Sequence, residues 1–259
     1  MKPIVCGIVN ATPDSFYDGG KYNNLIDHAK RLIDEGADWI DVGGESTRPG
    51  SLPISVQEEM DRVLPIVEQI SMLTTVSIDT TKARVAIEAS KLGASILNDV
   101  RGFQDLEMQE ASRLFDKAIL MHSRGRPDTM QSMTQYTSIV DDISNWLSKQ
   151  RQVCHAKEVW LDPGIGFAKD VKQNCVLLQS LRQLGSLGHP ILLGTSRKSF
   201  IGHLLNQPAS KDRLVGSLAT VADGWYKGVQ AFRVHDVKET KEMLTMLEHI
   251  QGPYTPSPI

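Results

Sequence analysis

Short apolar runs rich in β-branched residues alternate with longer amphipathic stretches along almost the whole chain. The apolar runs are PIVCGIV, DWIDV, TTVSID, ASILND, KAILMH, EVWLD, PILLG and QAFRVH, and each is typical of a buried strand. The amphipathic stretches predict helices over 24–35, 55–71, 81–92, 138–154, 170–184, 211–227 and 237–250, with a weaker one near 105–115. This βα repeat favours a parallel sheet.

Eight strands in 259 residues predict a (β/α)₈ TIM barrel, formed by a single α/β domain over residues 1–259. A doubly wound open sheet is the alternative. Polar residues near the carboxyl ends of the strands favour the barrel, because there these ends converge on one mouth. They are Asn10, Asp41, Asp79, Asn98, Asp99, His122, Asp162, Arg197, Lys198, Arg233 and His235. Helix capping explains some of the carboxylates, but arginine and lysine cannot cap a helix N-terminus.

The stretch over residues 55–71 carries two local signals. Ser55 and Glu58 have the spacing of a capping box, in which each side chain satisfies a backbone N–H at the start of the helix. Pro65 lies inside the same pattern, and we expect it to kink the helix or to lift it from its neighbours.

Composition narrows the classes of protein that this chain can belong to. A formal net charge of −3 indicates neither a nucleic-acid nor a membrane partner, and no apolar run approaches the ~18 residues of a membrane span. The first residues lead directly into a strand and do not read as a signal peptide. Cys6, Cys154 and Cys175 are odd in number and form no CxxC pair. We therefore expect a cytoplasmic chain without a disulfide framework.

Several common catalytic motifs are missing from the sequence: it contains no GxxxxGKS/T, no HExxH and no GxSxG. Seven other segments, in order from residue 4 to residue 236, resemble dihydropteroate synthase of folate biosynthesis. They are GIVNATPDSFYDGG, DVGGESTRPG, SIDTTKARV, LNDVRG, LDPGIGFAK, GTSRKSFIG and FRVHD. The resemblance implies a barrel that usually dimerises and that condenses 6-hydroxymethyl-7,8-dihydropterin pyrophosphate with p-aminobenzoate. The products are 7,8-dihydropteroate and pyrophosphate, and Mg²⁺ assists.

A pterin presents N–H donors along its aminopyrimidinone edge, and a buried carboxylate can accept two of them in strong, directional bonds. Asp79, Asn98 and Asp162 are similar to the family's pterin-contacting residues, and Lys198 resembles the group that reaches the acceptor side of the ring. A turn aspartate before Pro163 is the alternative interpretation of Asp162. The following segment IGFAK argues against it, because it supplies the apolar Phe167 beside this carboxylate as a further pterin-binding residue.

Pyrophosphate needs cations and N–H donors, and barrels often bind phosphate at their last loops. Arg233 and His235 lie directly before the last predicted helix, and Thr47 and Arg48 resemble further contributors. A surface ion pair with Glu45 is an equally good interpretation of Arg48. Asn10 offers a hard oxygen suited to Mg²⁺, which keeps several waters and bridges phosphate oxygens.

The p-aminobenzoate site is assigned by resemblance to Phe16, Pro49, Phe167, Lys198 and Ser199. TPDSFYDGG resembles the family's mobile first loop, in which Asp18 would face a developing cation. We expect a dissociative displacement, with Asp18, Lys198, Arg233 and His235 as the catalytic residues. Ile165 stands where a bulkier residue is common, so it could reshape the ring pocket.

Two other functions would also use a pterin-binding barrel. A pterin-binding methyltransferase barrel shares the pterin wall but needs neither an aminobenzoate pocket nor a pyrophosphate site, and TPDSFYDGG, STRPG and SRKS together argue against it. A pterin-binding or decayed barrel that serves as a partner protein is the non-enzymatic alternative. Polar residues on all the catalytic loops argue against decay.

Overall fold

Eight parallel strands form one sheet within residues 2–12, 21–46 and 50–251, which are the residues that this computed structural model describes. The strands are β1 (Ile4–Asn10), β2 (Trp39–Gly43), β3 (Thr75–Asp79), β4 (Ile96–Asp99), β5 (Lys117–Met121), β6 (Glu158–Asp162), β7 (Leu192–Leu193) and β8 (Ala231–Val234). Their order is β6-β5-β4-β3-β2-β1-β8-β7. A bridge between Leu161 and Ile191 joins β6 to the segment that enters β7 and closes the barrel. The predicted barrel and its eight predicted strands are confirmed.

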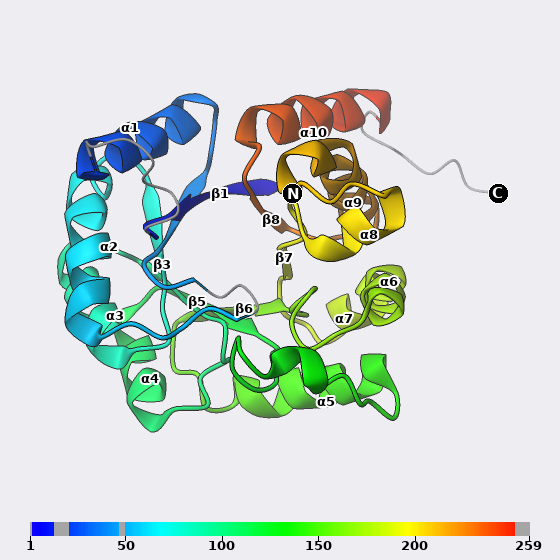
Figure 1. Ribbon diagram of the computed structural model, residues 1–259, viewed down its shortest axis with the longest axis horizontal. Coiled ribbons are helices and arrows are strands. Elements are labelled where there is room, and N and C mark those ends of the chain that lie inside the picture. Colours follow the sequence, from blue (N-terminus) through cyan, green and yellow to red (C-terminus); the bar gives the residue numbers. More distant parts are fainter. Residues whose placement is uncertain (1, 13–20, 47–49, 252–259) are drawn as a thin grey trace.

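Helices surround the strands on the outside of the barrel (Figure 1). They are α1 (Lys21–Asp34), α2 (Val56–Ile70), α3 (Ala83–Lys91), α4 (Leu106–Ala111), α5 (Ile139–Arg151), α6 (Val171–Gln179), α7 (Leu181–Gly185), α8 (Ser199–Leu205), α9 (Leu214–Tyr226) and α10 (Val237–Gln251). The helix expected over 170–184 is divided at Ser180 into α6 and α7, and α8 was not expected. Each described helix is too short or too polar to cross a membrane.

The inner face of the barrel changes from apolar to polar along the strands. A buried cluster fills the lower part and consists of Cys6, Trp39, Ile96, Ile119, Trp160, Leu192 and Ala231. Strand side chains alternate between the two faces of a sheet, so the residue two positions further along each strand lies on the same face. Those residues are Ile8, Asp41, Asn98, Met121, Asp162, Gly194 and Arg233. An apolar base therefore supports a polar mouth.

The start of α2 and the packing around its Pro65 both differ in part from the expectations drawn from the sequence. The Ser55 side chain accepts from the backbone N–H of Glu58 at 3.1 Å, as a capping residue does. The Glu58 carboxylate instead pairs with Arg62, one turn along the helix. The helix continues through Pro65, and the neighbouring Val63 and Ile66 are fully buried. Pro65 therefore does not lift this helix from its neighbours.

Candidate active site

A cavity of about 640 Å³ opens at the carboxyl ends of the strands. Nine of the residues predicted for the site line it, and they come from both halves of the sequence: Asn10, Asp79, Asn98, Asp162, Phe167, Lys198, Ser199, Arg233 and His235. The structure thus brings together each predicted site residue that it describes. Phe16, Asp18, Thr47, Arg48 and Pro49 lie outside the described residues.

A network of four side chains, two of them buried and two partly buried, forms the floor of the cavity. Arg233 donates from Nε to Asp41 at 2.5 Å and from Nη2 to Asp79 at 2.9 Å. Asn98 Nδ2 lies 3.3 Å from the nearer Asp41 oxygen. Asp41 is fully buried, and it fixes the orientation of both Asn98 and Arg233. From the sequence, Asp41 could be placed at a strand end but given no role, because no motif around it identifies partners that lie far away in the chain.

The carboxylates and the guanidinium of this floor shift one another's proton affinity. Burial raises the pKa of Asp79, and the nearby charge of Asp41 raises it further, while Arg233 opposes both. Burial alone would lower the pKa of Arg233, but Asp41 and Asp79 outweigh it and raise this pKa. The floor consequently holds two acidic groups around one cation that stays charged.

Asp162 combines a turn role with a place in the cavity wall. Its Oδ1 accepts from the backbone N–H of Gly164 at 2.7 Å, as the turn interpretation expects. Its Oδ2 faces Gly194, where an added Cβ would lie 3.8 Å away. Burial raises the pKa of Asp162, and Lys198 opposes this shift. Because Gly194 has no side chain, the second oxygen of Asp162 stays accessible from the cavity.

Lys198 lies opposite Asp162 and beside an aromatic ring. Its Nζ donates to the carbonyl oxygen of Ile165 and stands 4.7 Å from the centre of the Phe167 ring, within cation–π range. Burial lowers the pKa of Lys198 to about 8, although the charge of Asp162 raises it. Ile165 itself is fully buried in the core between barrel and helices. Ile165 is not among the residues that line the cavity, so an effect on the ring pocket stays a prediction and would act through its neighbours.

Cationic and hydroxyl groups surround the cavity near β7 and β8. His235 contacts the Ser196 hydroxyl through Nδ1 at 3.0 Å. Arg197 pairs with Asp236, and Arg213 donates to the backbone carbonyl of Arg197 at 2.9 Å. These cations are closer to solvent than the carboxylates of the floor, since the Arg197 side chain is 32% exposed and that of Asp79 only 10%. The cavity therefore has an acidic, buried floor and a basic edge.

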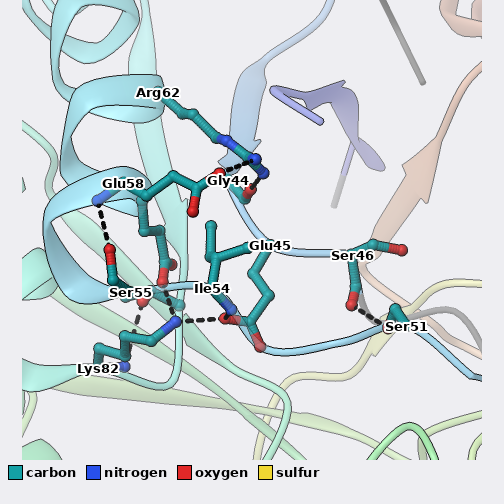
Figure 2. A network of polar contacts seen from close by, with 11 residues as sticks. Gly44, Glu45, Ser46, Ser51, Ile54, Ser55, Glu58, Arg62 and Lys82 are labelled. Carbon is teal, nitrogen blue, oxygen red and sulfur yellow. Dashed lines mark hydrogen bonds and ion pairs between the residues drawn. The ribbon is translucent and has the colours of Figure 1, made fainter. Parts of the chain in front are cut away.

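The segment after β2 is held against α2 and the residue that precedes α3 by charged pairs (Figure 2). Lys82 contacts the carboxylates of both Glu45 and Glu59. Arg62 donates to the carbonyl oxygen of Gly44 at 2.8 Å. Glu45 lines the cavity, and its Oε2 also accepts from the Ile54 N–H at 3.3 Å. The glutamate that one interpretation assigned to a pair with Arg48 is thus paired with Lys82.

The described residues of this cavity form no cluster of side chains that would hold a metal by themselves. Across residues 2–12, 21–46 and 50–251, no three or more His, Cys, Asp or Glu side chains gather as metal ligands would. Asn10, the predicted Mg²⁺ ligand, ends β1 and lines the cavity. A single amide oxygen beside open space suits a cation that takes its other ligands from phosphate and water.

Comparison with known proteins gives one consistent family. A family model described as "Pterin binding enzyme" matches residues 6–235. The dihydropteroate synthase of Escherichia coli K12 is 44% identical over 257 residues, which cover 95% of this chain and 91% of that protein.

Solved structures agree with this result. The dihydropteroate synthase of Xanthomonas albilineans, solved with 4-aminobenzoic acid, superposes with a TM-score of 0.91 at 36% identity and covers 98% of this chain and 94% of its own. That of Yersinia pestis, solved with a sulfonamide drug complex, has a TM-score of 0.88 at 40% identity and covers 96% of this chain and 94% of its own.

Proposed function

Because this chain belongs to the dihydropteroate synthase family of pterin-binding enzymes, we propose that its cavity joins p-aminobenzoate to a dihydropterin by dissociative displacement of pyrophosphate. The members of this family are transferases, and the reaction yields 7,8-dihydropteroate. The acidic, buried floor with its basic edge is the observation that carries the proposal. A ring rich in N–H donors suits the floor, and a diphosphate suits the edge.

The dihydropterin is proposed to bind with its aminopyrimidinone edge against Asp162, Asn98 and Asp79. Asp162 is 5% exposed and Asn98 4%, so a ring that left them without partners would incur a penalty of about 1–3 kcal/mol for each. Lys198 would donate to the acceptor side of the ring. A wrong ring is then rejected by its missing hydrogen bonds more than by its size.

The diphosphate is proposed to lie where the basic edge meets the floor, between His235 at the edge and Arg233 in the floor on one side and Thr47 and Arg48 on the other. The roles of Thr47 and Arg48 rest on the sequence alone. Asn10 would hold Mg²⁺ together with water and the diphosphate. When bound, the ion would neutralise charge that develops on the leaving group.

The p-aminobenzoate is proposed to bind beside Phe167, Lys198 and Ser199, with Phe16 and Pro49 completing the site. Phe167 and Lys198 are half-buried and Ser199 is exposed, so this side of the cavity can admit a second substrate after the pterin. The assignments of Phe16 and Pro49 come from the sequence alone.

Departure of pyrophosphate would leave a positive charge that the dihydropterin ring delocalises, and Asp18 is proposed to stabilise it. Arg233 and His235 would neutralise the leaving group, while Lys198 holds the ring in place. The aromatic amine is a weak nucleophile that needs alignment more than a strong base. The remaining work of the protein is therefore to position two substrates and to exclude water.

Release of pyrophosphate, measured with and without p-aminobenzoate, tests this function directly. We expect release that depends on p-aminobenzoate and that, at a pterin concentration below KM, falls after Asp162→Asn. A methyltransferase barrel or a non-catalytic pterin-binding protein would release none under either condition. Analysis of the product by mass spectrometry would distinguish dihydropteroate from a hydrolysed pterin.

The chain is further proposed to act in the cytoplasm as a homodimer. Cys6, Cys154 and Cys175 are free thiols, as a reducing compartment favours. Exposed large apolar side chains lie on the neighbouring helices α8, α9 and α10, among them Leu205 and Val215. Light scattering of the purified protein would give its oligomeric state.

A further inference from the structure

The loop between β6 and α6 has an unusual backbone. Gly164, Gly166 and Ala168 adopt positive φ values of 68°, 85° and 51°. A Cβ added at Gly164 would lie 1.9 Å from the carbonyl oxygen of His122, so only glycine fits there. Ala168 has a Cβ and is held in a conformation that alanine rarely adopts. Such a loop needs fixed partners to keep its shape.

Lys169 provides one of these partners from a buried position. Its side chain is 3% exposed, yet its Nζ contacts no carboxylate in the described part of the chain. The Nζ donates to the carbonyl oxygens of Gly164 at 2.9 Å and Phe167 at 2.8 Å, and lies 3.1 Å from His122 Nδ1. Burial lowers the pKa of Lys169 and Asp162 opposes it. In either protonation state Nζ keeps two N–H bonds, enough for both carbonyls.

Two further side chains hold the same loop from other directions. The Tyr136 hydroxyl donates to the carbonyl oxygen of Ala168 at 3.1 Å. The Asn174 Oδ1 accepts from the Gly166 N–H at 2.7 Å, and Asn174 is 2% exposed. The side chains of Lys169, Tyr136 and Asn174 thus satisfy backbone groups of residues 164–168 from three separate positions in the sequence.

The loop connects these partners to the pterin wall. Asp162 directly precedes it and accepts from its Gly164 N–H, while the carbonyl oxygen of Ile165 receives the Lys198 ammonium. Phe167 lines the cavity, whereas Lys169 does not. A change in the loop's shape would therefore move Asp162, Phe167 and Lys198 together.

We propose that Lys169, supported by Tyr136 and Asn174, is a positioning residue that fixes the pterin-binding geometry through the loop over residues 163–168. The proposal rests on the proposed function, because it takes Asp162 and Lys198 as pterin contacts. Lys169 ends the motif LDPGIGFAK, but the sequence reveals neither its burial nor its carbonyl partners.

Lys169→Met tests this role, because methionine keeps a similar length and removes each N–H donor. Lys172→Met, an exposed position on α6, is the matched control. We expect Lys169→Met to raise KM for the dihydropterin substrate about tenfold, with a folded circular dichroism spectrum, and the control to leave it unchanged. A pterin affinity in folded Lys169→Met equal to that of the parent chain would overturn the proposal.

A double-mutant cycle separates positioning from a general structural effect. If Lys169 acts partly through Asp162, Asp162→Asn combined with Lys169→Met should weaken binding of a pterin analogue by less than the sum of the two single losses. Losses that simply add would contradict the proposal. If Asp162→Asn alone leaves affinity unchanged, the proposed pterin site fails instead. Should Lys169→Met not fold, Tyr136→Phe decides: weaker pterin binding supports loop positioning and unchanged binding refutes it.

Discussion

Asp41→Asn removes one negative charge from the floor of the cavity while keeping the shape of the side chain. The parent carboxylate accepts from Arg233 at 2.5 Å and from Asn98 at 3.3 Å, and it is fully buried. Both contacts converge on Asp41 Oδ2, so the amide can place its oxygen there while its NH₂ group faces Asn98 Nδ2, which lies 3.5 Å from Oδ1 in the parent chain. We therefore expect the charged contact with Arg233 to be lost and the guanidinium to be left with Asp79 as its one remaining charged partner in this floor.

The magnitude follows from the kind of contact that is lost. A hydrogen bond to a charged group contributes about 1.5–3 kcal/mol, and breaking a buried ion pair costs about 3–5 kcal/mol. Part of this cost is offset, since the Asp41 charge raises the pKa of Asp79 and its removal eases the charging of that group. We expect a net loss of about 2–3 kcal/mol, which lowers Tm by roughly 4–12 °C in a chain of this size.

Thermal unfolding followed by circular dichroism measures this loss. Asp116→Asn is the control, because it makes the same chemical change at an exposed carboxylate that Lys157 pairs at 2.7 Å. Exposed pairs contribute about 0–1 kcal/mol, so its Tm should change little. Asp41→Asn should also lose most of its effect in an Arg233→Met background. Equal Tm losses for Asp41→Asn and the control, or full additivity with Arg233→Met, would refute the assignment of this pair.

Three further outcomes are expected. Asp79→Asn and Asp162→Asn should each weaken binding of a pterin analogue by about 1.5–3 kcal/mol in calorimetric titration, and unchanged affinity in both would rule out the pterin wall. His235→Ala should reduce affinity for the pyrophosphorylated pterin more than for the plain hydroxymethylpterin; equal losses in the same titration would place the anion elsewhere. Because the pKa of Lys198 is lowered to about 8, its ammonium is lost as pH rises through this value. The pH profile of kcat/KM should therefore fall above pH 8, and Lys198→Arg should move that decline upward; an identical decline would show that another group titrates.

Local sequence patterns predicted most of the fold because each strand is a short apolar run with a polar segment on either side. The same reasoning missed α8, whose first residues, SFIG, follow the charged pair Arg197 and Lys198 and read as a loop. It also joined α6 and α7, because the apolar pattern continues across Ser180 while the backbone there leaves the helical region. Apolar periodicity reports burial and does not report where a backbone ends one helix and begins another.

The site was predictable where a polar residue ends a strand and resembles a family motif, as Asp162 and Lys198 do. Asp41 was noted only as such a strand end, and its role depends on Asn98, 57 residues away, and Arg233, 192 residues away. Lys169 lies in a quoted motif, but its partners are backbone carbonyls, which every sequence contains. Roles that depend on tertiary contacts of this kind need coordinates to be seen.

The contact between β6 and the segment that enters β7 has a consequence for where the barrel opens transiently. It rests on a single bridge within the described residues, with the Leu161 N–H donating to the Pro190 carbonyl oxygen at 2.8 Å. Local opening should begin there, so the Leu161 amide should exchange its hydrogen with deuterated water sooner than amides of β3. Asp162 stands on one side of this join and Lys198 on the other. A ligand that contacts both Asp162 and Lys198 would link the two sides of this join and slow the hydrogen exchange of the Leu161 amide.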